Sequence, residues 1–385
     1  MACRVQDKTI DGVLELLSQE GFGAVSDALE VLFNEAMKLE RTAYLGVEAY
    51  ERSDERRGYA NGFKPKTVTS RVGELRVAVP QTRDGGFYPN ALEKGLRSER
   101  ALRLALAEMY VQGVSTRKVA KITEELCGVS INSMQVSRAA ALLDETLSAW
   151  RERPLGRFRY VYLDARYEKV RHGGQVVDCA VLVALGVDDQ GKRQVLGVSV
   201  ALSEQEVHWR SFLSDLKDRG LHGVELFVAD AHEGLKAARR AVFPSVPWQR
   251  CQFHLQQNAQ RYVPRQSMKR QVAADLRAVF NAPDEAEAQR QLTKFVERYR
   301  KSAPKLADWA EAAVPEGLAV FGFKDAHRRR LRTTNMLERV NKEIRRRSAV
   351  ATLFPNEASC LRLVTAVVME ISEEWETGRV YLSMD

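Results

Sequence analysis

The sequence has few cysteines, and their spacing excludes two common ways of stabilising a protein. Its 385 residues include five Cys, an odd number, and no two of them form a Cys-x-x-Cys pair. Disulfide frameworks use even, closely spaced sets of cysteines, and zinc ribbons use paired Cys-x-x-Cys motifs. We therefore expect reduced thiols at Cys3, Cys127, Cys179, Cys251 and Cys360.

Long hydrophobic runs are also absent. No stretch approaches the roughly 18 to 20 apolar residues that a membrane-spanning helix needs, and the first residues lack the apolar segment of a signal peptide. We expect a cytoplasmic protein without a membrane partner. The hydrophobic content of 45% is sufficient for two or three domains with proper cores in a chain of this length.

The charged residues are nearly balanced, with a small basic excess. Lys and Arg number 59 against 51 Asp and Glu, which gives a formal net charge of +8. This balance favours a polyanionic partner. The excess alone does not identify that partner, because many basic proteins bind none.

Residues 1–90 are predicted to form a helical and basic β-hairpin region. Apolar residues recur at helical spacing across 25–37, so we expect a helix that packs against another helix or another subunit. Two short β segments within 66–79 flank Gly73, and the Gly- and Pro-rich residues 80–89 follow as an extended arm.

Residues 91–150 have the pattern of a helix-turn-helix domain. Ser115 is placed to cap one helix and Gly128 to end it, and the next helix would present small polar and basic groups to a DNA groove. An ordinary helical hairpin is the alternative, because this pattern is loose on its own. The residues expected to contact DNA here are Arg117, Lys118, Gln135 and Arg138.

The remainder of the chain changes to an α/β pattern. Residues 151–252 give strands and helices in the order βββαβαβ, which is that of an RNase H-like nuclease core. Residues 253–325 are wholly helical and charged, with proline breaks, and 326–385 return to the core. We therefore expect an α/β RNase H-like catalytic core with a mixed sheet and an all-α insertion, preceded by the helical and β-hairpin DNA-binding region. The proline breaks are Pro264, Pro283 and Pro304.

Two aspartates stand at the ends of apolar strands. Asp164 follows Tyr-Val-Tyr-Leu, and Asp230 follows Leu-Phe-Val-Ala. Burying an unpaired carboxylate costs several kcal/mol, so a metal, a basic side chain or solvent must offset it. Arg166 is the ordinary structural partner for Asp164, and helix N-capping is the ordinary role for Asp230. Two such residues on strands that lie side by side point instead to a catalytic pair.

The third acid of this group is predicted to be Glu338, on a helix across residues 333–347. Leu337, Val340 and Ile344 form the stripe that would pack on the sheet. Helical spacing places Glu338 on a neighbouring face with Thr334, Asn341 and Arg345. The other acid of this helix, Glu343, is predicted to point away from that group.

Three carboxylates suit metal-dependent cleavage and transfer of phosphodiesters. Two divalent ions about 4 Å apart activate the attacking oxygen and stabilise the leaving oxygen. Hard cations such as Mg²⁺ or Mn²⁺ prefer carboxylate oxygens. We therefore expect two such ions per active site, bound by Asp164, Asp230 and Glu338.

Several other residues are candidates with open alternatives. His232 and Asn341 suit substrate positioning and a structural role equally well. Cys251 and His254 form a single Cys-x-x-His, for which packing or local hydrogen bonding is favoured over structural zinc. A basic run beside the helix of Glu338 is expected to contact phosphates, although such runs are often only solvated. Its members are Arg345, Arg346 and Arg347.

At these residues the sequence resembles the bacterial insertion-sequence branch of the Mutator-type transposases. The resemblance extends over nearly the whole chain. The segments that carry it are Gly58 to Gly62, Gly73 to Gly85, Leu163 to Ala165, Val228 to Gly234, Gln249 to His254, Thr334 to Arg347 and Phe354 to Trp375. The family's two Asp and one Glu correspond to Asp164, Asp230 and Glu338, and its Cys-x-x-His to Cys251 and His254.

The resemblance implies a transposase that cleaves DNA strands and transfers them with metal ions. It implies double-stranded DNA partners, namely terminal inverted repeats and target DNA, and action as a homodimer or larger synaptic complex. A bacterial, nucleoid-associated location would follow. Two other functions are possible alternatives: a DNA-binding regulator that does not cut, which the presence of all three acids disfavours, and a junction resolvase, which the long amino-terminal region disfavours.

Overall fold

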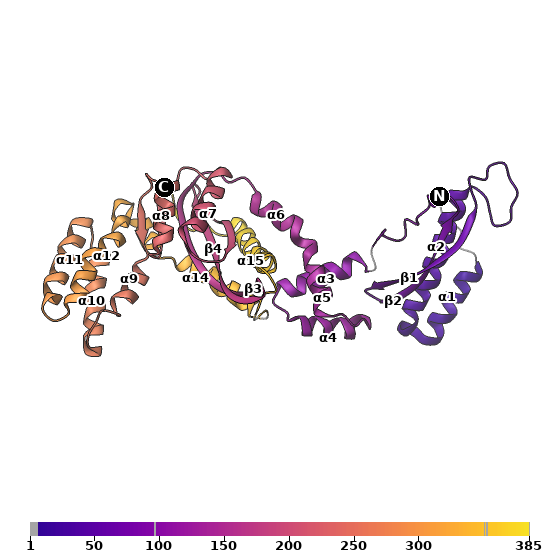
Figure 1. Ribbon diagram of the computed structural model, residues 1–385, viewed down its shortest axis with the longest axis horizontal. Helices are drawn as coiled ribbons and strands as arrows, with labels where there is room; N and C mark the ends of the chain where they lie inside the picture. Colours follow the sequence, from indigo (N-terminus) through magenta and orange to yellow (C-terminus); the bar gives the residue numbers. More distant parts are fainter. Residues whose placement is uncertain (1–6, 96–97, 350, 352, 385) are drawn as a thin grey trace. The chain divides into compact units, whose positions relative to one another are not determined.

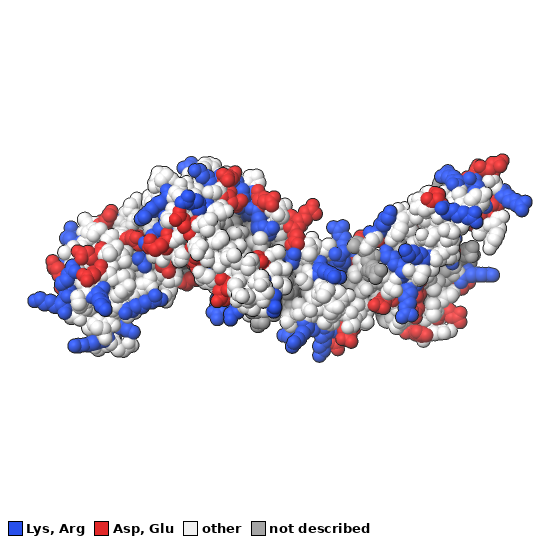
Figure 2. All heavy atoms as spheres, viewed as in Figure 1, with Lys and Arg blue, Asp and Glu red and all other residues white. Residues whose placement is uncertain are grey.

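The computed structural model describes residues 7–95, 98–349, 351 and 353–384, and the chain divides into two compact units (Figure 1). The N-terminal unit covers residues 1–142 and the C-terminal unit covers 143–385. Basic and acidic side chains are interleaved on the visible surface of each unit (Figure 2). The small basic excess of the composition is therefore not gathered into one large patch on the face shown.

The N-terminal unit begins with two helices and a β-hairpin. Helix α1 (Asp7–Glu20) leads through a short 3-10 turn, η1 (Gly21–Ala24), into α2 (Val25–Leu45). Strands β1 (Ala60–Ser70) and β2 (Gly73–Thr82) are antiparallel, which confirms the predicted hairpin around Gly73. Met37 of α2 packs against alternate residues of β2, because one face of that strand is buried. These β2 residues are Leu75, Val77 and Val79.

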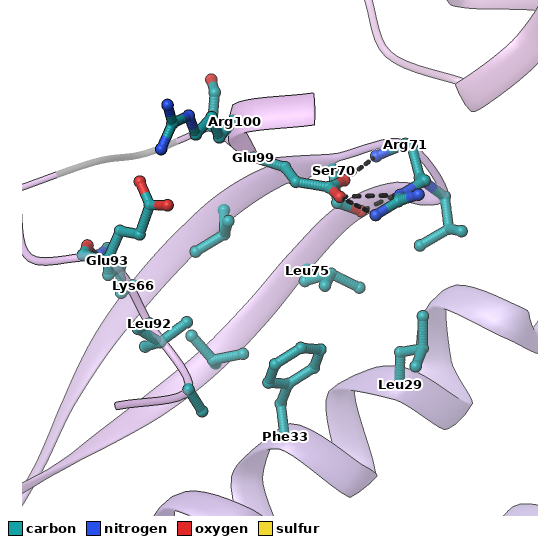
Figure 3. A pocket seen from close by; sticks show the side chains of 15 residues that line it. Leu29, Phe33, Lys66, Ser70, Arg71, Leu75, Leu92, Glu93, Glu99 and Arg100 are labelled. Carbon is teal, nitrogen blue, oxygen red and sulfur yellow. Dashed lines mark hydrogen bonds and ion pairs between the residues drawn. The ribbon is translucent and has the colours of Figure 1, made fainter. Parts of the chain in front are cut away.

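A pocket lies between α2 and this hairpin. Leu29, Phe33 and Leu75 form its apolar wall, as Figure 3 shows. Arg71 and Glu99 form an ion pair at the rim of the pocket. The predicted helix of residues 25–37 is thus confirmed, and it packs against α1, as predicted, and also against the hairpin of the same chain.

Three short helices complete this unit. The capping predicted for the second of them is confirmed: the Ser115 hydroxyl accepts a hydrogen bond from the Lys118 amide at 3.4 Å, and Gly128 ends the helix in the left-handed conformation with φ of 65°. Apolar residues that include Leu106, Val119 and Val136 form a core among the three helices. The helices are α3 (Arg100–Val111), α4 (Thr116–Cys127) and α5 (Ser133–Ala140).

The C-terminal unit is built on a five-stranded mixed sheet with strand order β5-β4-β3-β6-β7. The first three strands are antiparallel neighbours, whereas β6 and β7 run parallel to β3. Each predicted strand is present, since long runs of β-branched and aromatic residues alternate with turn residues. The strands are β3 (Phe158–His172), β4 (Gln175–Asp188), β5 (Arg193–Ala201), β6 (Leu226–Ala229) and β7 (Trp248–Arg250).

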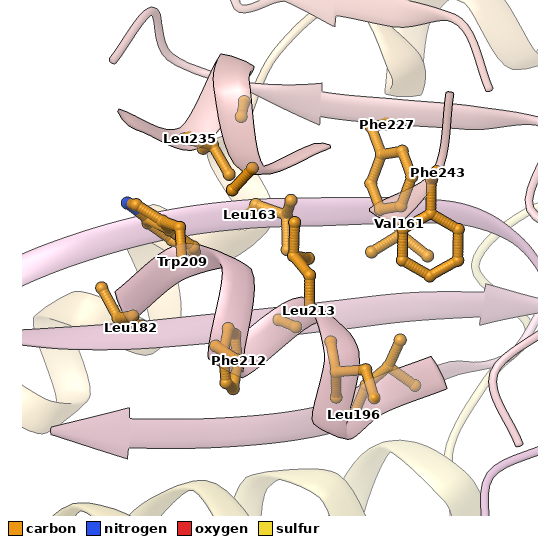
Figure 4. Close-up of a cluster of buried hydrophobic side chains, with 14 of the residues drawn as sticks. Val161, Leu163, Leu182, Leu196, Trp209, Phe212, Leu213, Phe227, Leu235 and Phe243 are labelled. Carbon is orange, nitrogen blue, oxygen red and sulfur yellow. The ribbon is translucent and has the colours of Figure 1, made fainter. Parts of the chain in front are cut away.

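Helices cover both faces of this sheet. On one face, the core includes Val161, Leu163 and Trp209, and it joins the sheet to α7 (Glu206–Asp218) and α8 (Glu233–Val242) (Figure 4). Alternate residues of β3 point to the opposite face. There the Tyr160 hydroxyl lies 2.8 Å from His327 Nδ1, and the Tyr162 hydroxyl donates to the Arg330 carbonyl at 3.2 Å. The helices that follow in sequence on this side are α13 (Asp325–Leu331), α14 (Asn335–Ser348) and α15 (Glu357–Thr377).

A wholly helical segment separates β7 from α13, as predicted. Pro264 and Pro283 lie between its helices, and Pro304 begins the last of them, where a missing amide hydrogen has no cost. Its main helices are α9 (Gln252–Ala259), α10 (Lys269–Phe280), α11 (Glu285–Arg300) and α12 (Pro304–Ala313).

Helix α6 (Asp144–Glu152) belongs to the C-terminal unit, although residues 143–150 were predicted to lie in the helix-turn-helix segment. Arg362 of α15 forms an ion pair with Asp144 at 2.6 Å, and the Arg151 guanidinium donates to Thr365 at 3.1 Å. These long-range contacts were not visible in the helical spacing of α6.

Candidate functional site

Two acids and a cysteine lie next to one another where β6 and β7 end beside the middle of β3. Tyr162 pairs with Val228 and Leu163 with Ala229, so the next step of the register places Asp230 beside Asp164. The Cys251 amide donates to the Ala229 carbonyl at 2.8 Å, which continues the row onto the neighbouring strand. Side chains alternate between sheet faces, so these three share the face that α14 covers.

Helix α14 crosses this row of strand ends. At its start, the Thr334 amide and hydroxyl each donate to Cys251 Sγ at 3.4 Å. Two turns later, Asn341 Nδ2 donates to Asp164 Oδ2 at 2.7 Å. Two helical turns rise about 11 Å, and three neighbouring strands span about 10 Å. The helix therefore passes from the end of β7 to β3, and it must cross β6 on the way.

Glu338 lies between these two contacts. It is four residues after Thr334 and three before Asn341, so all three share one face of the helix. Its place on α14 is the turn that passes Asp230, and its side chain is exposed. Among the described residues, no three His, Cys, Asp or Glu side chains lie close enough to hold a metal ion together. The structure thus puts Asp164 and Asp230 side by side and Glu338 on the facing helix, without drawing it into contact.

The surroundings of Asp164 disfavour its charged form. Burial raises its pKa to about 6, and the negative charge of Asp230 acts in the same direction. Hydrogen bonds from the Ala165 amide and Asn341, together with the charge of His254, oppose that shift. Arg166, the ordinary partner weighed from the sequence, forms its ion pair with Glu168 at 2.6 Å and also donates to the Asn341 carbonyl.

Asp230 faces a histidine whose charged form is favoured. His254 Nδ1 lies 3.7 Å from Asp230 Oδ2. A hydrogen bond with Cys251 raises the pKa of His254 to about 9 against the effect of burial, with further help from the charges of Cys251, Asp230 and Asp164. Burial by itself raises the pKa of Cys251, but hydrogen bonds from His254 and Thr334 outweigh it and leave that pKa lowered. Cys251 and His254 therefore form a polarised pair beside the acids.

Asp230 does not cap the following helix. The N-cap residue of α8 is His232, whose side chain makes no capping hydrogen bond, and Asp230 Oδ1 instead accepts from the Ala231 amide at 2.7 Å. His232 Nδ1 lies 3.8 Å from Glu204 Oε2. Of the two candidates for substrate positioning, Asn341 is the one that contacts Asp164.

The donor set at this row suits a hard cation. Asp164 and Asp230 supply carboxylate oxygens, and Asn341 Oδ1 is buried without a hydrogen-bond partner. A buried acceptor that lacks a donor is costly, and a water or a cation beside it removes that cost. Oxygen ligands of this kind are those that Mg²⁺ and Mn²⁺ prefer.

The far end of α14 is held by ion pairs. Hydrogen bonds with Arg346 lower the pKa of Glu343 to about 2, against a smaller effect of burial and with help from Arg347. Arg347 is 5% exposed and also pairs with Glu370 of α15. The prediction that Arg347 contacts phosphate is therefore corrected: its guanidinium joins two helices of the protein. Arg346 is exposed but paired with Glu343, and Arg345 is exposed.

The other predicted DNA contacts lie in the N-terminal unit. Arg117 and Lys118 are exposed in the first turn of α4, and Gln135 and Arg138 are exposed on α5. Gln135 also completes a capping box, in which its side chain accepts from the Asn132 amide at 2.8 Å. These four residues are separate from the row of acids, which belongs entirely to the C-terminal unit.

The sequence analysis did not predict which residues contact Asp230 and Cys251. Neither the contact of Thr334 with Cys251 nor that of His254 with Asp230 was expected. A signal was present, because Cys251 follows β7 directly, as Asp230 follows β6. Side chains that follow neighbouring parallel strands meet at one edge of the sheet.

Comparison with known proteins identifies the family of the chain. The family described as "Transposase, Mutator family" matches residues 7–378. The chain is 58% identical over 387 residues to the transposase for insertion sequence element IS406 of Burkholderia multivorans, with complete coverage of both chains.

Two further relatives are more distant. The transposase for ISRM5 of Rhizobium meliloti is 42% identical, with 99% of this chain and 96% of that protein covered. The transposase for IS256 in transposon Tn4001 of Staphylococcus aureus is 37% identical, with 93% and 92% covered. None of the helices in the described part of the chain is long and apolar enough to cross a membrane. The chain belongs to the Mutator family of transposases.

Proposed function

We propose that the C-terminal unit is an RNase H-like core that cleaves DNA strands and transfers them, with two Mg²⁺ or Mn²⁺ ions bound by Asp164, Asp230 and Glu338. The observation that carries this proposal is the path of α14. Its contacts at Thr334 and Asn341 fix both ends of a two-turn stretch over the acid row, with Glu338 between them. Glu338 is expected to join the two aspartates when the ions and DNA bind.

The protein's own residues prepare this site in complementary ways. Asn341 and the Ala165 amide each donate to one oxygen of Asp164, and each oxygen keeps a second lone pair for a cation. The positive His254 balances the charge of Asp230 until a cation binds. When bound, the two ions would activate the attacking oxygen and stabilise the leaving oxygen of a phosphodiester. The raised pKa of Asp164 fits this role, because a buried carboxylate without a full countercharge favours a cation.

We further propose that the N-terminal unit binds the terminal inverted repeats of an insertion sequence. Helices α4 and α5 would act as a helix-turn-helix, with base and phosphate contacts from exposed residues, and the hairpin would add backbone contacts. The named relatives are insertion-sequence transposases, which supports this substrate. Terminal repeats lie at two ends, so a homodimer or larger complex would bring them together with target DNA. The proposed contacts of this unit are Arg117, Lys118, Gln135 and Arg138, and in the C-terminal unit Arg345 is proposed to contact phosphate.

The decisive test is strand cleavage and joining on a labelled duplex that copies the repeat flanking the gene. Asp164→Asn, Asp230→Asn and Glu338→Gln keep the side-chain shape and remove a negative ligand, so each should lower the Mg²⁺-dependent rate about 1,000-fold. Glu343→Gln, on the same helix, should retain cleavage, because Glu343 pairs with Arg346 and Arg347.

Three outcomes of this assay would change the proposal. Wild-type activity in all three triad variants would reject the catalytic assignment. Equal losses for Glu338→Gln and Glu343→Gln would reject the choice of glutamate. Repeat binding by the wild-type protein without any cleavage would favour a DNA-binding regulator.

A further inference from the structure

An exposed aromatic side chain lies beside the acid row and has no role in the site described so far. Phe253, in the first turn of α9, is 41% exposed. Its ring contacts the His254 ring edge-on, with centroids 5.5 Å apart and planes at 62°. Because His254 lies 3.7 Å from Asp230, the Phe253 ring is only one side chain away from the proposed cleavage site. Several other aromatic side chains of the described residues are also exposed, so it is the place of Phe253 beside the acids that is informative.

The backbone that carries Phe253 is firmly held. On its N-terminal side, Cys251 is fully buried, and Gln252 is only 2% exposed. The Gln252 side chain donates to the Gly317 carbonyl at 2.8 Å and accepts from Arg332 at 3.0 Å. The backbone amide of Gln252 donates to the Arg332 carbonyl at 2.9 Å. The exposed ring thus projects from a rigid support, which lowers the entropy lost when it binds a ligand.

The exposed face of α9 continues away from the acids with polar groups. Gln257 is one turn after Phe253, and Arg261 is one turn after Gln257, just beyond the helix end. All three are exposed, and Phe253 and Gln257 share one side of the helix because they are spaced by four residues. An aromatic ring, an amide and a guanidinium in this order match a base, a hydrogen-bonding edge and a phosphate of a single DNA strand.

We propose that Phe253 stacks on an unpaired nucleobase next to the phosphate that is cleaved, with Gln257 and Arg261 holding the same strand. This inference rests on the proposed function, because it assumes that the phosphate lies at Asp164 and Asp230. If the duplex opens next to the cut phosphate, the base that loses its partner needs a new surface to stack on. Phe253 supplies that partner at the site itself, on a support that does not need to be ordered first.

The test uses full-length protein and the repeat duplex with one 2-aminopurine, left unpaired at the nucleotide beside the cleaved phosphate. Without Mg²⁺, wild-type protein should quench this fluorescence because the base stacks on Phe253. Phe253→Ala should leave the 2-aminopurine fluorescence unquenched, and Phe253→Trp should restore quenching. With Mg²⁺ and a fully paired duplex, Phe253→Ala should cleave about tenfold or more slowly, which is the loss expected for one base stack.

Two controls separate stacking from a structural role of the ring. Phe253→Leu keeps apolar contact with His254 but has no aromatic face, so it should behave as Phe253→Ala does. Tyr262→Ala removes an exposed aromatic ring near the end of the same helix, one that stacks on Trp309, and should quench as wild type does. Quenching by Phe253→Ala equal to that of wild type would overturn the inference. The wild-type cleavage reaction run in parallel tests the proposed function separately.

Discussion

The two units of this protein present their proposed functional groups in opposite ways. In the N-terminal unit, basic and polar side chains stand exposed on short helices, and the core beneath them is formed by other residues. In the C-terminal unit, Asp164 and Asp230 are partly buried, and Asp164 accepts a hydrogen bond from Asn341 of a distant segment. Each phosphate contact adds separately to the affinity for DNA, whereas catalysis needs a few groups at fixed positions. Substitutions in the two units should therefore have separable effects.

The largest expected effect comes from removing the C-terminal unit. A fragment of residues 1–142 should bind the terminal repeat in preference to random duplex, and it should have no cleavage activity at all. All three proposed metal ligands lie beyond residue 142, and the hairpin and helices α3 to α5 lie within the fragment. Gel-shift and cleavage assays on the same duplex measure both properties. Equal affinity for repeat and random DNA would contradict the proposal that the N-terminal unit recognises the repeat.

Replacing single exposed basic residues of the N-terminal unit should weaken DNA binding without abolishing it. Arg138→Ala should weaken repeat binding about tenfold if Arg138 reads a base, whereas Arg117→Ala should lower the dependence of affinity on salt by about one counterion. Neither should change the cleavage rate at saturating DNA. Lys8→Ala on α1 removes the same charge from a helix outside α4 and α5 and serves as the control. Equal effects of all three variants would indicate unspecific attraction only.

Loss of the hydroxyl contact between Thr334 and Cys251 should slow cleavage without abolishing it. Thr334→Val removes the hydroxyl donor at the start of α14 while the backbone amide remains, so Glu338 should be held less precisely. Loss of such a supporting contact typically costs 10- to 100-fold. Thr334→Ser retains the hydroxyl and should cleave nearly as wild type does. Full cleavage by Thr334→Val would show that α14 is positioned by its other contacts.

The smallest effect concerns stability without metal. Asp164 has a folded-state pKa of about 6, above the ordinary value of 3.8, so the folded state holds its proton more tightly than the unfolded state does. Stability is therefore lost as pH rises from about 4 through about 6. Asp164→Asn should raise the melting temperature by a few degrees at pH 7.5 in EDTA and leave it nearly unchanged at pH 4. Mg²⁺ should stabilise wild type but not the variant, and a lower melting temperature for the variant at pH 7.5 would contradict this electrostatic explanation.

Sequence patterns were informative about single elements and about residues that strands place directly. The alternation and apolar runs of β3 and β6 were sufficient to locate Asp164 and Asp230 on adjacent strands. Local capping signals at Ser115 and Gly128 also predicted the bounds of α4. These features depend on residues close together in the chain.

Features that depend on distant segments were not predictable. The rotation of α14 about its axis decides that Asn341 meets Asp164 and that Arg347 is buried against Glu370. Arg347 looked like part of an exposed basic run, because the sequence alone does not show which side of that run α15 covers. The same reason explains α6, whose helical spacing gave no sign of its ion pair with Arg362.

The most direct test of the central claim is a metal-specificity switch at the three proposed ligands. Cysteine at Asp164, Asp230 or Glu338 offers a soft thiolate that binds Mg²⁺ poorly and Mn²⁺ better. We expect Asp164→Cys, Asp230→Cys and Glu338→Cys to be inactive in strand cleavage with Mg²⁺ and to recover activity with Mn²⁺, while Glu343→Cys cleaves with either ion. Wild-type activity of any of the three in Mg²⁺, or the absence of recovery in Mn²⁺ for all of them, would contradict metal binding by these acids.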